Sequence, residues 1–586
     1  MAARVMIQVG DGWLLFQRPR RVVVADGVEG VMPALQAIET AVNQNGQYAA
    51  GFLAYEAAAA FGLTVYSADQ LPGGLPWLWF GLFDAPTRLP RLSPAAAAYQ
   101  IGPWQPVLTP AAYHAGIGRI KSHIARGQTY QINYTFPLHA PFAGDPYALF
   151  VDLAAAQQGE YAAYLDNGEW AICSASPELF FRLDGDRLTS RPMKGSAPRG
   201  RTLEEDEANM AWLAQSEKNR AENVMIVDMI RNDMGRIAGT GSVSVPHLFT
   251  VERYPTILQM TSTVTATTDA PVTDILAHMF PCASITGAPK VRTMELIRDL
   301  EPQPRGVYTG SIGVIAPGRK ARFQVAIRTV VVDRSRQQAI YGVGSGVVWD
   351  SDAAGEWEEC LLKARVLTAR RPPFSLLESL LWDERDGYFL LPDHLARLSA
   401  SAAYFAIPLD LPGIERALMR YAVHLRGRCK VRLLVGAAGE SHIMHEPLAL
   451  MPASETIPIG LSPTSIDSND VWLYHKTTHR AVYDAARAAR PDCDDVLLWN
   501  ERGELTETTT ANIVLELDGV LATPPVTCGL LPGTLRASLL RRDPLTPTPN
   551  GLPLQERTLT PADLNRCQAI YLINSVRRWR PARLLS

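Results

Sequence analysis

A single lysine lies in a stretch whose backbone is unusually constrained. Residues 191–200 read RPMKGSAPRG, so Pro192 precedes Lys194 and two glycines and a further proline follow it. Glycine and proline are the usual residues of surface turns, and the decapeptide alone favours a solvated lysine on such a turn. The alternative is a cation that the rigid backbone holds in position for chemistry. The remaining polar residues decide between the two.

Carboxylates inside otherwise apolar segments are a second candidate for chemistry. Glu178 begins a strand-like run in SASPELFF, and Glu222 lies among apolar neighbours in a helix-like run. Glu356, Glu359 and Lys363 follow at i, i+3 and i+7, which places them on one helix face. Two carboxylates from different helices form the kind of oxygen-rich site that Mg²⁺ takes. Taken singly, each glutamate fits a solvated or salt-bridged surface residue equally well.

The last third of the chain contains a further lysine and glutamate in polar company. Lys476 stands in HKTTHR, and Glu507 stands in ELTETTTAN. From their local sequence alone, Lys476 fits an ordinary lysine and Glu507 fits a charge at a strand edge.

These residues require elements that hold them, and the pattern predicts a mixed α+β chain. At 586 residues the chain exceeds what one core usually supports, so we expect two or three domains. Apolar spacing and stop signals predict helices over 110–127, 204–235 and 354–369. Strand-like runs occupy 129–138, 169–176, 178–183, 306–316, 321–333 and 338–349. The stretch RRPPF (370–374) ends the last of these helices and marks the main boundary.

Composition excludes several classes of protein. The net charge is −3, with 47% hydrophobic and 20% charged residues, which gives no basic excess for nucleic acid. No run approaches the roughly 18 uninterrupted apolar residues of a membrane span. The seven cysteines are scattered and form no CxxC pair, which argues against a disulfide scaffold and a zinc site. The N-terminus lacks the features of a signal peptide, so we expect a cytoplasmic protein.

An ordered set of blocks resembles the chorismate-utilising enzymes. The blocks are SASPELFF, PMKGSAPRG, EKNRAENVMIVDMIRNDMGR, FPCASITGAPKVRTMELI, GVYTGSIGVI, FQVAIRT and GEWEECLLKA, which together cover roughly residues 110–368. Within that family, anthranilate and isochorismate synthases have alanine before the Gly-Ser/Thr of the second block. Component I of the aminodeoxychorismate synthases has lysine there. Lys194 therefore makes this chain similar to the aminodeoxychorismate synthase group.

The resemblance implies a role for each residue of the first set. Glu222 and Glu359 would hold a Mg²⁺ that binds the ring carboxylate of chorismate. Glu178 would be the general acid that protonates the departing C4 hydroxyl. Lys194 would attack C2, which blocks that carbon and leaves C4 open to ammonia. A rigid, partly desolvated loop would favour the neutral amine that this attack requires.

Substrate binding is implied for five further positions. Arg328, Lys363 and the backbone of Thr286, Gly287 and Ala288 would bind the carboxylates of the substrate.

Three features depart from the usual pattern of the family. Gln259 stands where members often have histidine, and 281–284 reads PCAS where PAGS or PGGS is common. The Leu-Leu-Glu-Ser signature of the family's tryptophan site occurs at 376–379, beyond the boundary, and we interpret it as coincidence.

The remainder of the chain resembles the fold-type IV pyridoxal-phosphate enzymes, over nearly all of 375–586. The blocks GYFLLPDHLARLSASAAYF, HKTTHRAVYDAAR, ETTTAN and GLLPGTLR carry this likeness. It implies that Lys476 is the covalent anchor and proton carrier, and that Glu507 faces the pyridine nitrogen. Arg397 would bind the phosphate, aided by the backbone N–H groups of Gly533 and Thr534 at a helix start.

Together these expectations describe a bifunctional enzyme that makes 4-aminobenzoate for folate. A two-sheet chorismate-utilising fold over 1–370 would precede a fold-type IV α/β domain over 374–586. No G-x-C-x-G nucleophile block occurs, so ammonia would come from a separate glutamine amidotransferase. The oligomeric state stays open, with a homodimer through the pyridoxal-phosphate domain as one option. The alternatives are an anthranilate-type synthase joined to a branched-chain or D-amino-acid-like aminotransferase, and a non-catalytic scaffold.

Overall fold

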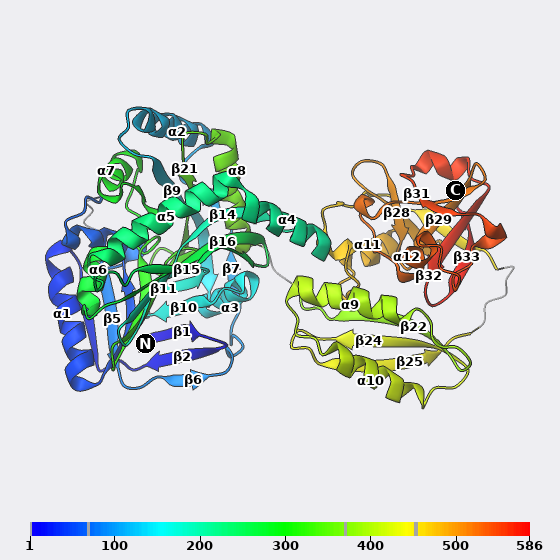
Figure 1. The fold of residues 1–586 in the computed structure, drawn as a ribbon, viewed down its shortest axis with the longest axis horizontal. Coiled ribbons are helices and arrows are strands. Elements are labelled where there is room, and N and C mark those ends of the chain that lie inside the picture. The colour runs from blue at the N-terminus through cyan, green and yellow to red at the C-terminus, as the bar shows by residue number, and fades with distance from the viewer. Residues whose placement is uncertain (1–2, 67–70, 369–371, 450–454, 586) are drawn as a thin grey trace. The chain divides into compact units, whose positions relative to one another are not determined.

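The chain forms two compact units (Figure 1). The computed structural model describes residues 3–66, 71–368, 372–449 and 455–585. The first unit takes the chain up to Pro198 and again from Asn209 to the predicted boundary. The second takes Arg199–Ala208 together with the chain from Pro372 onward. The boundary stretch 370–374 lies partly outside the described residues, so a division at that point stays a prediction.

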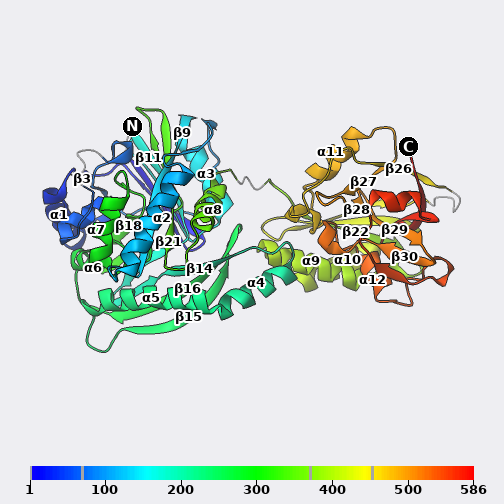
Figure 2. The ribbon, with the colours of Figure 1, turned by 90° about the horizontal axis from the view of Figure 1, so that it is seen from above.

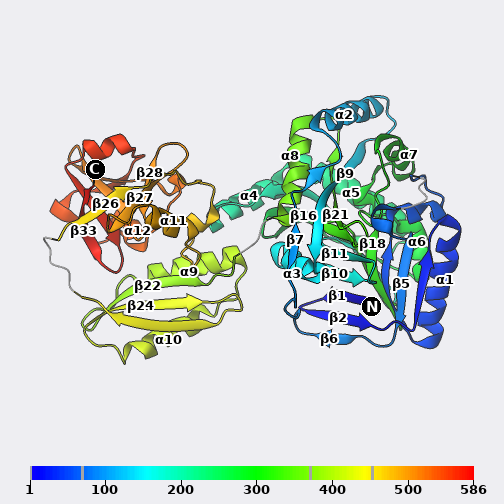
Figure 3. The same ribbon diagram turned by 180° about the vertical axis from the view of Figure 1, so that it is seen from behind.

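The first unit contains two large antiparallel sheets. One has the strand order β17-β9-β21-β20-β11-β10-β1-β2-β6, with β7 and β8 also paired to β9; β1, β2 and β6 form its free end (Figure 3). Its strands are β1 (Arg4–Val9), β2 (Gly12–Gln17), β6 (Thr87–Leu89), β7 (Tyr99–Ile101), β8 (Gln105–Pro106), β9 (Gln131–Gly144), β10 (Tyr161–Asp166), β11 (Trp170–Ser176), β17 (Gly287–Ala288), β20 (Thr329–Asp333) and β21 (Gln338–Val347).

The second sheet of this unit has the order β14-β16-β13-β12-β19-β18-β4-β5-β3, with β15 also paired to β16. Its strands are β3 (Arg21–Ala25), β4 (Tyr48–Leu53), β5 (Leu78–Phe83), β12 (Leu179–Asp184), β13 (Arg187–Arg191), β14 (Met193–Pro198), β15 (Ser244–Arg253), β16 (Ile257–Thr267), β18 (Ser311–Ala316) and β19 (Lys320–Val325).

Side chains of both sheets alternate between two cores. In β1, Val5 and Ile7 pack into a core shared with β4, β11 and β18, whereas Met6 packs into a core shared with the helices over the first sheet. The unit therefore has four layers, helix–sheet–sheet–helix, in which nearly every central strand is buried on both faces. Its helices are α1 (Val28–Asn45), α2 (Pro110–Ala125), α3 (Pro146–Gln157), α5 (Glu217–Gly235), α6 (Val272–Met279), α7 (Lys290–Leu300) and α8 (Ala353–Ala364).

Helix ends follow local side-chain chemistry. The Thr109 hydroxyl accepts from Ala112 N–H at 3.2 Å and begins α2. The single helix expected over 204–235 is divided into α4 (Leu203–Gln215) and α5. Ser216 is extended between them, and its hydroxyl caps α5 by accepting from Asn219 N–H. A serine inside an amphipathic run thus ended one helix and began the next. Helix α5 lies alongside β14 and β16 (Figure 2).

The run 321–333, expected as one strand, forms two strands that belong to different sheets. β19 ends at Val325 in the second sheet, and β20 starts at Thr329 in the first. Between them Arg328 has φ 51°, in the left-handed region that non-glycine residues rarely adopt. Such strain persists where surrounding contacts fix the residue. Arg328 thus lies where the chain passes from one sheet to the other.

The second unit contains two further sheets. A four-stranded antiparallel sheet packs with α9 (Leu391–Phe405) and α10 (Leu411–Ala422) around one core; its order is β23 (Gly387–Tyr388), β22 (Leu376–Asp383), β24 (Arg428–Val435) and β25 (Ser441–Pro447). An eight-stranded sheet has the order β28 (Leu505–Thr508), β27 (Asp495–Trp499), β26 (Ile457–Leu461), β33 (Arg578–Leu584), β32 (Ala569–Asn574), β29 (Asn512–Leu517), β30 (Val520–Thr523) and β31 (Leu554–Glu556). A further pairing of β28 with β29 closes six of these strands into a ring. The helices α11 (Ala481–Ala489) and α12 (Thr534–Leu540) complete the unit.

The predicted mixture of helices and sheets is confirmed. Among the described residues, no helix combines the length and the apolar character that crossing a membrane requires.

Candidate active sites

Lys194 lies on β14, where its ammonium faces helix α5. Its Nζ is 3.7 Å from Glu222 Oε2, and its side chain is 15% exposed. A Cβ added to Gly346 on β21 would collide with this Nζ, so the lysine also reaches the first sheet. The structure therefore places Lys194 between the two sheets and not on a solvated turn.

Hydrogen bonds fix the backbone around Lys194. Asn223 Nδ2 donates to the carbonyl of Lys194 at 3.0 Å, and the Ser262 hydroxyl in turn donates to Asn223 Oδ1 at 2.6 Å. Gln259 Nε2 donates to the carbonyl of Gly195 at 2.7 Å. Gly195 has φ 95°, which favours glycine. Gln259, which departs from the family pattern, is thus one of the groups that hold the lysine loop.

Glu178 is a buried carboxyl close to this lysine. Burial raises its pKa to about 7, although the Ser284 hydroxyl and the positive charge of Lys194 act in the opposite direction. Ser284 Oγ donates to Glu178 Oε1 at 2.6 Å. The serine of the unusual PCAS block therefore contacts the carboxyl directly. A carboxyl with a pKa near neutrality is suited to donating a proton.

Glu359 and Lys363 form an ion pair on α8. Lys363 Nζ lies 2.7 Å from Glu359 Oε1 and also donates to the carbonyl of Gly344 at 2.9 Å. The positive charge of Lys363 lowers the pKa of Glu359, and the charge of Lys194 adds a smaller effect in the same direction. Arg328 Nη1 donates to the main-chain carbonyl of Lys363 at 3.2 Å. Glu359, Lys363 and Arg328 are thus adjacent, and Lys194 is close enough to act on the charge of Glu359.

The loop Thr286–Ala288 borders the end of β9. Gly287 and Ala288 form β17, which pairs with Ile132 and Gln131. Gly287 has φ 154°, and a Cβ there would collide with the carbonyl of Gln131. The loop is therefore fixed against β9, and its glycine is required by the close approach of the two backbones.

Gln131 is a site residue that the sequence analysis missed. Its side chain is 1% exposed, and within the described part of the chain neither amide atom has a hydrogen-bond partner. A Cβ on Gly346 would meet both Gln131 Nε2 and Lys194 Nζ, so both side chains reach the same space. A polar residue buried beside a candidate nucleophile points to a polar ligand. A lone glutamine within the apolar run YQINYTF was the available signal.

The carboxylates of this site suit a metal ion that shares its ligands with a bound anion. No group of three or more His, Cys, Asp or Glu side chains that could hold a metal occurs among the described residues. Two glutamates, Glu222 and Glu359, instead lie within the influence of one lysine. Mg²⁺ commonly takes one or two carboxylates and completes its shell with water and substrate oxygens. The donor set therefore fits Mg²⁺ as a substrate-bound ion.

The second unit has a cavity of about 830 Å³ that contains the residues predicted for the cofactor. Its lining includes all five predicted residues: Lys476, Glu507, Arg397, Gly533 and Thr534. Positive side chains also contribute, including Arg480 and Arg577. A cavity of this size with convergent polar groups is typical of a small-molecule site.

Lys476 and Glu507 occupy buried positions in this cavity. Burial, followed by the charge of Arg397, lowers the pKa of Lys476 to about 8. Burial raises the pKa of Glu507 to about 7. The hydroxyl of Tyr483 donates to Glu507 Oε1 at 2.7 Å, and Leu531 N–H donates to the same oxygen at 3.0 Å. A partly neutral amine and an oriented carboxyl are the groups that pyridoxal phosphate requires.

Arg397 is held by a buried glutamate from β22. Its Nε and Nη2 donate to the two oxygens of Glu378 at 3.0 and 2.7 Å. Burial alone would raise the pKa of Glu378, but the contacts with Arg397 and His394 have the larger effect and lower this pKa to about 2. Glu378 belongs to the Leu-Leu-Glu-Ser run at 376–379. That run therefore has a structural role here, because it fixes the arginine fork.

Gly533 precedes α12, as expected for a helix start. It is the N-cap of the helix that begins at Thr534. A Cβ at Gly533 would collide with Asn512 Oδ1, so this turn requires glycine. Asn512 Nδ2 donates to Glu507 Oε2 at 3.1 Å and to the carbonyl of Leu531 at 3.0 Å. Asn512 thus links the glycine turn to the buried carboxyl.

Two family models match this chain. One, described as chorismate binding enzyme, matches residues 12–369. The other, described as amino-transferase class IV, matches residues 375–585.

Curated relatives match about half of the chain. The chain is 39% identical over 284 residues to aminodeoxychorismate synthase component 1 of Salmonella typhimurium, which covers 48% of this chain and 60% of the relative. It is 42% identical over 284 residues to aminodeoxychorismate synthase of Streptomyces griseus, with 48% and 39% covered. Anthranilate synthase component 1 of Thermus thermophilus is 39% identical over 259 residues, with 44% and 55% covered. The chain thus matches less than two thirds of these relatives' lengths, and identity alone does not separate the two activities.

Solved structures share the fold of the first unit. Anthranilate synthase component I from Streptococcus pneumoniae has a TM-score of 0.51 at 23% identity, and covers 62% of this chain and 92% of its own. An isochorismate synthase structure from Bacillus anthracis has a TM-score of 0.52 at 19% identity, with 62% and 95% covered. Since the first family model covers more than half of the chain, this protein belongs to the chorismate binding enzymes and has a class IV aminotransferase domain after that part.

Proposed function

We propose that the chain converts chorismate into 4-aminobenzoate in two reactions, one in each unit. The first would replace the C4 hydroxyl of chorismate by ammonia and release water. The second would release pyruvate from the resulting 4-amino-4-deoxychorismate. The observation that carries the proposal is a lysine, Lys194, beside the carboxyls of Glu222 and Glu178 in a chorismate-binding fold.

In the first reaction Lys194 Nζ would attack C2 of the ring as the C4 hydroxyl departs. Glu178 would give its proton to that hydroxyl, so that water leaves. Ammonia would then form a bond at C4, the bond between Lys194 and C2 would break, and the ring would regain its arrangement of double bonds. Glu222 and Glu359 would hold Mg²⁺, which neutralises the ring carboxylate when bound. Arg328, Lys363 and the Thr286–Ala288 loop would bind the substrate's carboxylates.

In the second reaction the chain would bind pyridoxal phosphate in the cavity of the second unit. The cofactor, when bound, supplies an electron sink next to the substrate amine. Lys476 would anchor it, take the proton from C4, and return a proton to the methylene carbon of the departing pyruvate. Glu507 would keep a proton on the pyridine nitrogen, and Arg397 with the Gly533–Thr534 turn would bind the phosphate.

Product analysis tests the proposal. The purified chain with chorismate, ammonium and Mg²⁺ should form 4-amino-4-deoxychorismate, and added pyridoxal phosphate should convert it to 4-aminobenzoate and pyruvate. Glutamine alone should give no product, because ammonia would come from a separate glutamine amidotransferase. Product from glutamine with the pure chain would contradict that part.

The second candidate is an anthranilate-type synthase joined to an aminotransferase. The observation behind it is that an anthranilate synthase component 1 is also 39% identical to part of this chain. Anthranilate as the main product, or amino transfer to a 2-oxo acid, would replace the first proposal with this one. The homodimer and the cytoplasmic location remain predictions.

A further inference from the structure

A short segment from the chorismate-enzyme part of the sequence is built into the second unit. Arg199–Ala208 lies within the range matched by the chorismate binding model, yet it groups with the class IV unit. It begins directly after β14, the strand that contains Lys194. Leu203 packs against the core formed by α9, α10 and the four-stranded sheet.

The segment has a rigid internal arrangement. Asp206, which is fully buried, accepts from Arg199 Nε at 2.9 Å and from Gly200 N–H at 2.7 Å. Glu205 accepts from Arg201 N–H at 2.7 Å and from Arg201 Nη2 at 2.6 Å. A Cβ on Gly200 would collide with the backbone of Glu205 and Asp206. These two carboxylates fix the direction in which Arg199 and Arg201 point.

Helix α9 receives the first part of the segment. Tyr404 donates its hydroxyl to the carbonyl of Gly200 at 2.7 Å, and Arg199 Nη2 donates to the carbonyl of Tyr404 at 2.9 Å. The Arg199 guanidinium also lies 4.4 Å from the centre of the Tyr404 ring. Two hydrogen bonds and a cation–π contact thus act at one position of α9.

Arg201 contacts the two residues that precede Lys476. Its Nη1 donates to the hydroxyl of Tyr474 at 2.9 Å. Its main-chain carbonyl lies 3.1 Å from His475 Nε2, and the other ring nitrogen of His475 bonds the hydroxyl of Ser401 at 2.9 Å. The main-chain carbonyl of Lys476 accepts from Leu377 N–H at 2.9 Å.

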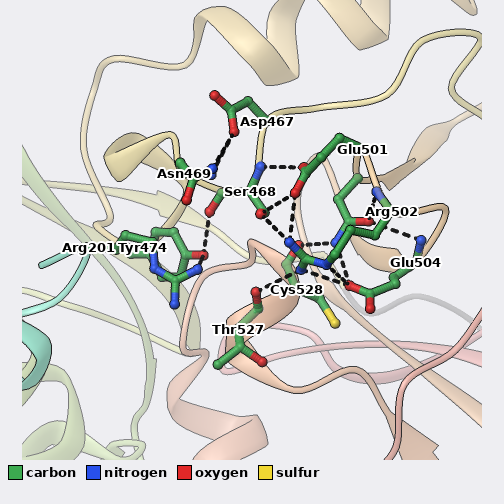
Figure 4. A network of polar contacts seen from close by, with 11 residues as sticks. Arg201, Asp467, Ser468, Asn469, Tyr474, Glu501, Arg502, Glu504, Thr527 and Cys528 are labelled. Atoms are coloured by element: carbon green, nitrogen blue, oxygen red, sulfur yellow. Dashed lines mark hydrogen bonds and ion pairs between the residues drawn. The ribbon is translucent and has the colours of Figure 1, made fainter. Parts of the chain in front are cut away.

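The contact with Tyr474 continues into a wider polar network (Figure 4). Tyr474 donates to the carbonyl of Ser468 at 2.7 Å. Ser468 donates through its N–H and its hydroxyl to Glu501 at 2.8 and 2.7 Å. Arg502 Nη1 donates to Ser468 Oγ at 2.7 Å. Arg201 therefore lies at one end of a chain of hydrogen bonds that orders the loop leading to Lys476.

We propose that Arg201, presented by the segment Arg199–Ala208, positions Lys476 for the cofactor of the second unit. The side chain of this arginine contacts Tyr474 and its carbonyl contacts His475, so that it fixes the two consecutive residues before the lysine. The proposal rests on the proposed pyridoxal-phosphate function of this unit. Arg201 is a positioning residue, since it acts through Tyr474 and His475 and not on the cofactor.

The test is a titration of the full-length chain with pyridoxal phosphate, followed by the visible absorbance of the lysine-bound cofactor. Arg201→Ala should weaken binding about tenfold, because Tyr474 loses a charge-assisted hydrogen bond. Arg201→Lys, which keeps one donor, should recover part of the loss. Gly200→Ala, which displaces the segment, should weaken binding at least as much. The control Arg557→Ala removes an exposed ion pair with Asp518 in the same unit and should leave affinity unchanged.

Two further measurements separate positioning from general stability. The pH midpoint of cofactor uptake should rise in Arg201→Ala, because a less buried Lys476 holds its proton more tightly. In a Tyr474→Phe background, Arg201→Ala should weaken cofactor binding by less than a further threefold, because the hydrogen bond between Arg201 and Tyr474 is already absent. Chorismate consumption by the first unit should stay at the wild-type rate.

The outcomes are distinct for the two proposals. If the wild-type chain binds no pyridoxal phosphate, or if Lys476→Ala still gives the lysine-bound absorbance, the proposed function of the second unit is wrong. If the wild type binds but Arg201→Ala binds equally tightly with an unchanged pH midpoint, the positioning role is wrong. A loss of chorismate consumption equal to the loss of cofactor binding would also overturn it, because the segment would then serve the first unit.

Discussion

Replacing Glu178 by glutamine should reduce activity and raise stability, with a gain that grows as the pH rises from 4.5 to 8. Burial raises the pKa of Glu178 from 4.5 to about 7. At about 1.4 kcal/mol per pKa unit, ionising this carboxyl in the folded protein costs roughly 3 to 4 kcal/mol. When folding raises the pKa of a group, the protonated group contributes fully to folding stability at a pH below its pKa in the unfolded chain. This contribution is lost as the pH rises through the pKa in the folded protein. The wild type should therefore lose roughly 3 to 4 kcal/mol between pH 4.5 and pH 8, and Glu178→Gln should not.

The assay compares the melting temperature of the first unit's transition at pH 5 and pH 8. The advantage of Glu178→Gln over the wild type should be several degrees larger at pH 8. Chorismate consumption at pH 7 should fall at least a hundredfold, because the amide has no acidic proton to give.

A matched control is available in the same unit. Glu56 is also buried with a pKa raised to about 7, and it accepts hydrogen bonds from the N–H groups of Arg305 and Gly306. Glu56→Gln should change stability with pH in the same direction and leave chorismate consumption intact. If Glu178→Gln keeps more than a tenth of the activity, Glu178 is not the acid. If its melting temperature shows no added advantage at pH 8, burial does not raise the pKa.

Three further predictions follow from the same sites. Removing Mg²⁺, or replacing Glu222 or Glu359 by alanine, should lower chorismate consumption at least a hundredfold and leave pyruvate release from supplied 4-amino-4-deoxychorismate unchanged; a near-normal rate at saturating Mg²⁺ would mean that the residue is no ligand. Lys194→Ala should lose most 4-amino-4-deoxychorismate formation, and chromatography should detect a residual product that shifts toward anthranilate, because C2 is no longer blocked; a wild-type rate would restore the interpretation as a solvated turn. Lys476→Ala should consume chorismate with ammonium but accumulate 4-amino-4-deoxychorismate, and the release of 4-aminobenzoate at more than a few per cent of the wild-type rate would rule out the lysine's role.

The candidate nucleophile could be predicted from the sequence, but the groups that hold it could not. The proline and glycine residues around Lys194 indicated a fixed backbone, and the resemblance supplied the role. Asn223, Gln259 and Ser284 come from distant segments, and no periodicity reports that they meet at one loop. Each is a polar residue with an ordinary local sequence, so only the pairing of strands and the packing of α5 show what it contacts.

Elements were predictable where one signal dominated. Apolar spacing with the Gly127 stop gave α2 to within a few residues, and the structure adds the Thr109 cap. The run 204–235 failed because Ser216 forms a cap that amphipathic spacing does not reveal. The run 321–333 failed because its apolar residues continue through a change of sheet at Arg328.

Glu378 shows a different limit of sequence reasoning. The Leu-Leu-Glu-Ser run was set aside because its position did not fit the family that uses this signature. Its glutamate instead binds Arg397 in the second unit. The role of this glutamate, which is to hold Arg397, is visible only from the hydrogen bonds between the two side chains.

The route of the chain has a consequence for how such a fusion can change by recombination. The chain enters the second unit at Arg199, returns to the first at Asn209, and enters the second again at Pro372. A crossover at the predicted boundary (370–374) would exchange the class IV half but leave the segment that contacts Tyr404, Tyr474 and His475 with the synthase half. An incoming half would therefore have to present matching partners at three positions. The sequence before the fusion point thus restricts which class IV domains can replace the one after it.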